Sequence, residues 1–173
     1  MALENSIIQQ NLEATFGNKV FNFQQEKDIF SFEINPDDNI AVVLFLKNSP
    51  DLNFHFLTDL CAIHYPDNDD EHQFAIVVHM HNWVENKRIK IKTYLPGENP
   101  SIKTLSKIFS CTNWMERECY DFYGINFAGH PQLKRILNMD EMVSFPMRKE
   151  FPMEDSGRTD KDDRFFGRTY TNN

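Results

Sequence analysis

Glycine and cysteine are scarce in this 173-residue sequence, and the patterns they fail to form exclude several classes of enzyme. The six glycines make neither GxGxxG nor GxxxxGK[ST], so no loop that cradles a nucleotide phosphate is predicted. The GxSxG pattern of serine hydrolases and the HExxH pattern of zinc peptidases are absent too. Cys61, Cys111 and Cys119 form no CxxC pair, and three thiolates cannot hold an iron–sulfur cluster in the usual four-thiolate manner. We expect free thiols in a reducing compartment.

Long apolar runs and an excess of basic charge are also missing. The longest apolar run, residues 40–46, is far shorter than the roughly 18–20 residues that span a bilayer. Residues 1–17 have no basic segment and no cleavage-like end, so no signal peptide is expected. A formal net charge of −8 disfavours nucleic acid as a partner. The composition therefore predicts a soluble, cytosolic chain.

Phenylalanine is abundant, and with a hydrophobic fraction of 40% the 16 phenylalanines supply a core for one domain with a tail. Apolar residues at helical spacing predict a helix over residues 3–16 that stops at Gly17. Alternating apolar residues predict short strands around 21–23 and 30–34. Asn35-Pro36 is typical of the start of a second helix.

The middle of the chain is predicted to be an antiparallel meander with one buried face. Strands are expected at residues 54–65, 74–80 and 87–95, and the last of them alternates most cleanly. The fold class that follows is α+β, with a mixed or antiparallel sheet packed with helices.

Two helices are expected after the meander. Ser101 is expected to cap a short helix that buries Ile102, Leu105, Ile108 and Phe109. The next helix, over residues 114–123, is expected to begin at Asn113, with Glu116 completing a capping box. Gly124 is a natural left-handed terminator.

The character of the sequence changes near Asn138. Aromatic residues, prolines and charges of both signs then alternate without a helical or strand period. We divide the chain into a globular domain, residues 1–137, and an extended C-terminal arm, residues 138–173, that docks on neighbouring chains. Composition alone supports equally well an arm that folds back over its own domain.

Metal sites are weakly indicated. A metal site could be imagined from Cys61-x-x-His64 and from His79 and His81, which share one strand face, but no second close cysteine pair accompanies them. The acidic segment at residues 67–71 lacks the glycine and the distal glutamate of a calcium loop. Histidines on a polar sheet face and a solvated acidic turn are the favoured interpretations, so no metal, cofactor or catalytic residue is predicted.

Residues 116–137 are densely charged. Their ionisable groups fit acid–base machinery, or a charge-paired network in which Arg117 makes forked bonds to carboxylates. The network is favoured, because no nucleophile, metal ligand set or cofactor cradle accompanies these residues.

The same stretch resembles the signature of the 30-kDa-type subunit of respiratory complex I, the C subunit of the bacterial enzyme. The matching positions are Glu116-Arg117-Glu118, Asp121, Phe122-Tyr123, His130, Lys134 and Ile136-Leu137. Two further segments are similar to family motifs, residues 59–66 to D-L-x-A-x-D-Y-P and residues 145–152 to H-P-L-R-K-D-F-P. The chain departs from them at His64, where Asp is usual, at Phe145, where His is usual, and at Glu150, where Asp is usual.

The resemblance implies a subunit of a proton-translocating NADH:quinone oxidoreductase that has no cofactor and no activity of its own. FMN and iron–sulfur clusters would lie in partner subunits. The expected partners are the 49-kDa-type quinone-site subunit and neighbouring cluster-bearing subunits, peripherally on the cytoplasmic side of the bacterial inner membrane. The helix and the following loop would be ordered by Glu116, Arg117, Glu118, Asp121, His130 and Lys134. The arm would dock through Arg148, Lys149, Phe151 and Pro152.

Two alternatives remain open. One is the equivalent subunit of a related complex driven by ferredoxin or a reduced deazaflavin. The other is a free-standing metal-dependent or acid–base enzyme that uses Glu116, Glu118 and His130.

Overall fold

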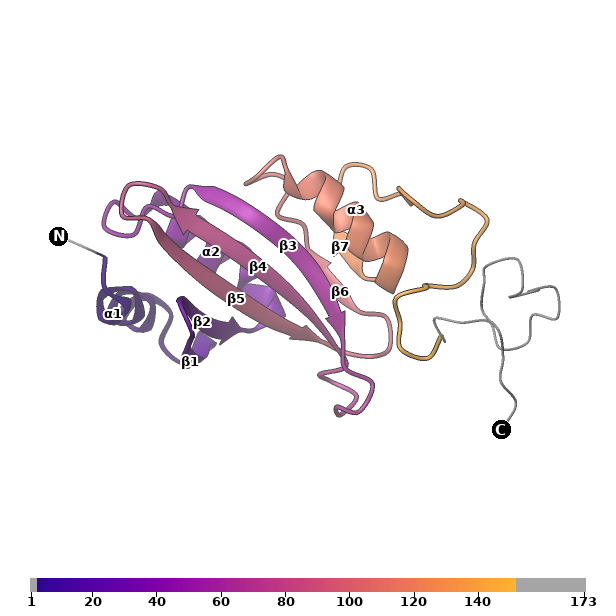
Figure 1. Cartoon of the computed structure of the whole chain (residues 1–173), viewed down its shortest axis with the longest axis horizontal. Helices are drawn as coiled ribbons and strands as arrows, with labels where there is room; N and C mark the ends of the chain where they lie inside the picture. The colour runs from indigo at the N-terminus through magenta and orange to yellow at the C-terminus, as the bar shows by residue number, and fades with distance from the viewer. Residues whose placement is uncertain (1–2, 152–173) are drawn as a thin grey trace, which may run out of the picture.

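A five-stranded mixed sheet with helices packed against it forms the centre of the computed structural model, which describes residues 3–151 (Figure 1). The strand order is β1-β2-β5-β4-β3. The strands are β1 (Val20–Glu26), β2 (Ile29–Ile34), β3 (Phe56–His64), β4 (Phe74–Asn82) and β5 (Lys87–Leu95). The predicted α+β class and all five strands are confirmed.

The sheet is mixed because β2 lies parallel to β5, whereas the other neighbouring strands are antiparallel. Burial alternates along β5 as the sequence predicts. The expectation of one buried face is wrong for β4, where Ala75 and Val77 on the second face are also buried. These short side chains lie opposite Tyr94 and Lys92 of β5, and the longer neighbours exclude solvent from them.

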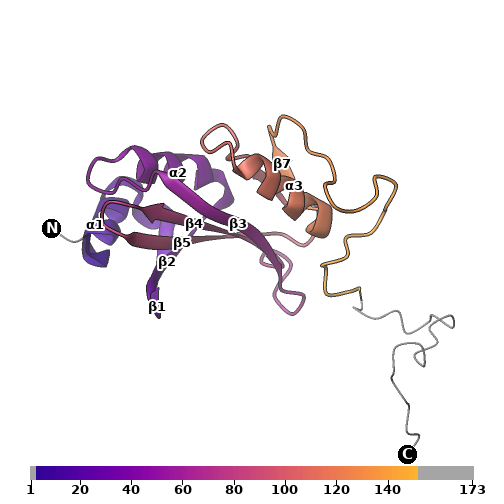
Figure 2. The ribbon, with the colours of Figure 1, turned by 45° about the horizontal axis from the view of Figure 1, so that its top comes forward.

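Helices α1 (Asn5–Phe16) and α2 (Asn39–Asn48) lie on one side of the sheet (Figure 2). Short 3-10 turns, η1 (Gly17–Lys19) and η2 (Pro36–Asp38), adjoin them. Gly17 ends α1 with a φ of 57°, a conformation that favours glycine. Side chains from both helices join strand residues in one core: Ile8, Leu12, Val42, Val43 and Leu46. No helix within residues 3–151 is long and apolar enough to cross a membrane.

A second, two-stranded sheet replaces the short helix expected after Ser101. β6 (Ser101–Lys103) runs parallel to β7 (Asn126–Ala128), and α3 (Thr112–Tyr123) connects them. The extended backbone is stabilised beyond the ladder, since the Lys103 carbonyl accepts from the Asn39 side chain and the Thr104 N–H donates to Ala128. These partners are distant in sequence and override the local preference for a helical turn.

Candidate functional site

Helix α3 carries most of the predicted site residues, but it begins differently from the expectation. Its N-cap is Cys111, not Asn113, and no side chain caps it. Glu116 therefore forms no capping box, and its side chain is fully buried. Gly124 ends the helix in the predicted left-handed conformation, with a φ of 74°.

Glu116 connects α3 to the segment that follows β6. Its carboxylate accepts hydrogen bonds from the Thr104 hydroxyl and, at 2.7 Å, from the Leu105 N–H. Burial raises the pKa of Glu116, because desolvation outweighs those hydrogen bonds and the nearby His130 ring. The buried carboxyl thus holds α3 to this segment, and each of its oxygens accepts a hydrogen bond.

His130 lies beside the Glu116 carboxyl without forming a close ion pair with it. Its Nε2 is 3.9 Å from Glu116 and 3.1 Å from the Asn113 carbonyl. Its Nδ1 accepts the Gln132 N–H, so the ring proton is assigned to Nε2, which donates to Asn113. His130 therefore joins the loop after β7 to the start of α3.

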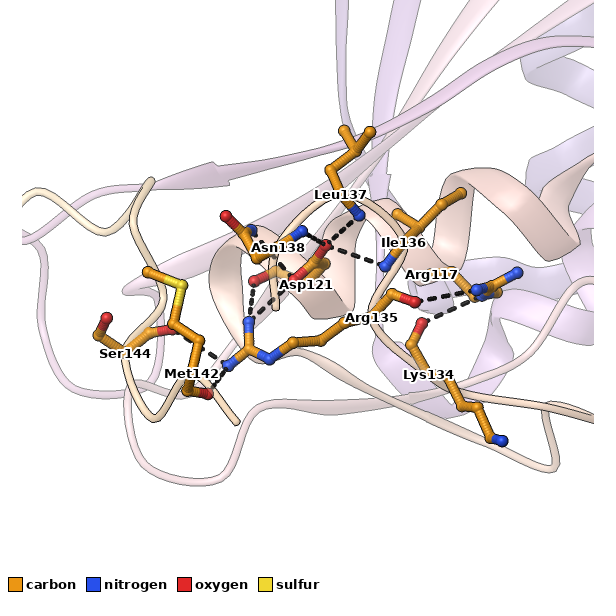
Figure 3. A network of polar contacts seen from close by, with 9 residues as sticks. All are labelled: Arg117, Asp121, Lys134, Arg135, Ile136, Leu137, Asn138, Met142 and Ser144. Atoms are coloured by element: carbon orange, nitrogen blue, oxygen red, sulfur yellow. Dashed lines mark hydrogen bonds and ion pairs between the residues drawn. The ribbon is translucent and has the colours of Figure 1, made fainter. Parts of the chain in front are cut away.

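Asp121 makes the densest set of contacts in the site (Figure 3). Its Oδ2 accepts the N–H groups of Ile136, Leu137 and Asn138 at 3.0, 2.8 and 2.9 Å. Its Oδ1 accepts from Arg135 and from the Asn138 amide. Burial by itself raises the pKa of Asp121, but the backbone donors and the guanidinium together lower it by more than that. The resulting pKa lies well below the usual range.

Two arginines fix the same loop through carbonyl oxygens (Figure 3). Arg135 donates to the carbonyls of Asp121, Met142 and Ser144 in addition to the Asp121 carboxylate. Arg117 donates to the Lys134 and Arg135 carbonyls, so the expectation that it forks onto carboxylates is wrong. Side chains that the sequence reasoning missed but that complete the site are Thr104, Arg135 and Asn138.

The predicted residues do not all converge. Glu116 is buried near the middle of α3 and Asp121 near its C-terminal end, whereas Glu118 is exposed. Lys134 is exposed as well and contributes its carbonyl. Within residues 3–151, no three His, Cys, Asp or Glu side chains are grouped to hold a metal ion. The arrangement is that of a helix and a following loop held together by charged side chains.

The start of the arm packs on the domain. Arg148 donates to the Tyr123 carbonyl, and its guanidinium lies 5.0 and 4.8 Å from the Phe74 and Phe145 rings. The Lys149 N–H donates to Nδ1 of His64. These are contacts of the kind that the fold-back alternative expected, and docking on other chains stays a prediction.

The two other predicted arm residues add little here. The Phe151 side chain is 39% exposed. Pro152 lies outside the described residues.

The chain is similar to known proteins over most of its length. The family model "Respiratory-chain NADH dehydrogenase, 30 Kd subunit" matches residues 32–157. A relative from Rhizobium meliloti (strain 1021), named as the C 2 subunit of NADH-quinone oxidoreductase, is 38% identical over 140 residues, 80% of this chain and 75% of that protein. The C subunit of NADH-quinone oxidoreductase from Roseiflexus castenholzii (strain DSM 13941 / HLO8) is 32% identical over 96% of this chain and 95% of its own length.

Solved structures give the same picture of the fold. The trypsin-resistant fragment (1-134) of Nqo5 matches with a TM-score of 0.60 and 25% identity, over 73% of this chain and 98% of the fragment. A chain of the membrane-bound sulfane sulfur reductase, an archaeal respiratory membrane complex, matches with a TM-score of 0.72 over 86% of this chain and 85% of that one. The second match, at 24% identity, concerns the fold alone.

Proposed function

Because the chain belongs to the family of the 30 Kd subunit of respiratory-chain NADH dehydrogenase, we propose that it is a non-catalytic structural subunit of a proton-pumping NADH:quinone oxidoreductase. The family match over residues 32–157 carries the proposal. The site geometry supports the non-catalytic role, since the oxygens of Glu116 and Asp121 accept hydrogen bonds from the chain's own groups. These two carboxylates hold α3 to neighbouring segments of the same chain.

The proposed partners are the 49-kDa-type quinone-site subunit and the cluster-bearing subunits beside it. Exposed apolar side chains follow one another from the end of the domain into the start of the arm and support an interface there: Leu137 at 69%, Met139 at 73%, Val143 at 94% and Met147 at 49% exposure. FMN and iron–sulfur clusters belong, in this proposal, to partner chains. The protein reaches the cytoplasmic face of the bacterial inner membrane through the complex.

Purification from the native host tests the proposal. A tagged full-length chain should co-purify with the 49-kDa-type quinone-site subunit and with NADH:quinone oxidoreductase activity. A matched variant, Val143→Asp/Met147→Asp, should fold normally but lose this association, because a charge on the exposed apolar surface disfavours its burial. Recovery of the tagged wild-type chain only as a free monomer would refute the proposal.

A related complex that takes electrons from ferredoxin or a reduced deazaflavin is the second candidate. The relatives named as NADH-quinone oxidoreductase subunits favour the NADH-driven complex. Activity of the purified assembly with each donor separates the two, since in either proposal the electron-input module lies on other chains. A free-standing enzyme built on Glu116, Glu118 and His130 is disfavoured, because Glu118 is exposed while the other two side chains are buried.

A further inference from the structure

The side chain of His64, the last residue of β3, contacts the start of the arm. It is buried, and its ring stacks on the Phe74 ring of β4 with 4.5 Å between the two centroids. On the arm side, its Nδ1 accepts the Lys149 N–H at 2.9 Å. Arg148 lies against the same Phe74 ring, with its guanidinium 5.0 Å from the centroid. His64 and Phe74 together therefore form the part of the sheet that the arm contacts.

The hydrogen bond from Lys149 requires a neutral imidazole. A ring nitrogen that accepts must keep its lone pair, so the proton of neutral His64 is assigned to Nε2. An imidazolium carries a proton on both nitrogens and accepts on neither. Protonation of His64 would therefore leave the Lys149 N–H facing another N–H group, whichever way the ring is turned.

The surroundings of His64 also disfavour its charged form while the arm is in place. Burial is the largest effect, and it lowers the pKa of His64. Glu150 raises that pKa, but its side chain is exposed and lies 3.8 Å from Arg148. Arg148 and Lys149 lower the pKa, and the Phe74 ring on β4 carries no charge. The docked arm thus favours neutral His64.

Two further contacts attach the same segment of the arm to α3. The Met147 N–H donates to the Phe122 carbonyl at 3.2 Å, and Arg148 donates to the Tyr123 carbonyl at 2.8 Å. Backbone carbonyls do not titrate, and the Tyr123 phenol stays neutral at ordinary pH because burial raises its pKa. Among the described groups at this contact, His64 is therefore the one whose charge changes between about pH 5 and about pH 8.

We propose that His64 makes the docking of the arm depend on pH: the neutral ring holds residues 147–149 on the sheet and α3, and protonation releases them. The docked state keeps its full advantage above about pH 6.5, the ordinary pKa of a histidine side chain. That advantage is lost as the pH falls through the lower pKa of His64 in the docked state. Release makes the Arg148 and Lys149 side chains available to other chains. The inference concerns the chain's own arm and holds whichever complex the protein joins.

Hydrogen exchange of backbone amides in the full-length, isotope-labelled chain tests the proposal. The protection factors of the Lys149 and Met147 amides, which correct for the intrinsic effect of pH, should be about fivefold or more lower at about pH 5 than at about pH 7.5. The His64 ring signals, followed by NMR in the same samples, should titrate with the same midpoint. Equal protection at the two pH values, or a different midpoint, would overturn the proposal. A loss at Lys149 alone would overturn it as well, because one hydrogen bond would then break without release of the arm.

Two variants distinguish His64 from other groups that titrate. In His64→Asp a carboxylate can accept the Lys149 N–H throughout this range, so the protection of both amides should be the same at about pH 5 and about pH 7.5. The control His79→Gln removes a histidine of β4 whose pKa is also lowered by burial, but whose charged neighbours are Asp59 and Lys90. It should keep the pH dependence of the wild type. An unchanged pH dependence in His64→Asp, or its loss in His79→Gln, would overturn the assignment to His64, and the wild-type comparison stands even if the Asp variant does not fold.

Discussion

The guanidinium of Arg135 and the carboxylate of Asp121 meet at 2.8 Å in the interior, although 14 residues separate them in sequence. The Asp121 side chain is 0% exposed and that of Arg135 is 8% exposed. The pair holds the loop after β7 against α3, because Asp121 also takes three consecutive backbone N–H groups of that loop. The predicted arm begins at Asn138, the last of these three residues.

Replacing Arg135 by Met should reduce the free energy of unfolding by about 3 kcal/mol or more, because a buried carboxylate loses its charged partner. Urea unfolding followed by circular dichroism measures the loss. Arg117→Met is the matched control and should cost only about 1 kcal/mol, since Arg117 donates to carbonyls and leaves no buried charge unpaired. Equal losses in the two variants would contradict the central role of Arg135.

Asp121 should make stability depend on pH under acidic conditions. Its pKa in the folded chain lies well below the ordinary value of 3.8, so folding favours the ionised form. The stability advantage of the wild type over Asp121→Asn should therefore be full above about pH 4 and decline as the pH falls toward the folded pKa. Unfolding free energies of both proteins between about pH 2.5 and about pH 7 measure it. A constant difference across this range would argue against the assignment.

The contribution of Glu116 to stability should depend on pH with the opposite sign. Burial raises its pKa above 4.5, so folding favours the protonated form. The stability of the wild type relative to Glu116→Gln should be greatest below about pH 4.5 and fall as the pH rises through the folded pKa. At about pH 7 the Gln variant should be within about 1 kcal/mol of the wild type, because an amide keeps the acceptor for the Leu105 N–H. The same pH series measures both carboxyls, and parallel slopes would refute the distinction.

The five longer strands could be predicted because buried and exposed side chains alternate along a strand, and this alternation is visible in neighbouring residues of the sequence. Ile89, Ile91 and Leu95 are buried on one face of β5, as their spacing indicates. The short strand β6 could not be predicted in this way. Its partner residues lie 25 positions later, with Ser101 opposite Asn126, and three residues carry no readable period.

The site can be predicted in outline, but its partners cannot. The charge pattern marks Glu116 and Asp121 as important, but their donors are largely backbone N–H groups, which any residue type provides. Arg135 and Asn138 flank Ile136-Leu137, and this position beside a matched motif is the available signal. The burial of Asp121 depends on how the loop returns to the helix, which no local pattern encodes.

Two departures from the family motifs could not be interpreted from sequence. They are His64 of the sheet and Phe145 of the arm, and both lie where the arm contacts the sheet. His64 accepts the Lys149 N–H and stacks on Phe74, while Phe145 and Phe74 both lie against Arg148. The substitutions therefore fall at one place in the fold, where the arm first contacts the sheet. Their proximity is a property of the tertiary structure and has no counterpart in sequence spacing.

Gly124→Ala should destabilise the domain by two separable effects. A φ of 74° costs a non-glycine residue about 1 kcal/mol, and an added Cβ would lie 2.5 Å from the Phe145 ring. The overlap should cost about 1–3 kcal/mol more. In a Phe145→Ala background only the backbone cost should remain. A double-mutant cycle from urea unfolding measures the difference, and additive costs would show that the ring moves aside freely.

Deleting the residues after Asn138 should leave a folded domain that no longer assembles with its partners. Asn138 itself completes the Asp121 contacts, so the helix–loop unit stays closed. A chain that ends at Phe151 keeps Arg148 between its two aromatic rings and should therefore melt at a higher temperature than the shorter one.

Calorimetry on both truncated chains, beside co-purification in the native host, separates the two contributions of the arm. If the arm only docks on other chains, ending the protein at Asn138 or at Phe151 should give the same melting temperature. If residues 139–151 are part of the domain, the shorter chain should lose several degrees while still melting cooperatively. The contacts of Arg148 and Lys149 favour the second outcome. Loss of any cooperative transition in the shorter chain would mean that residues 1–138 are not an independent domain.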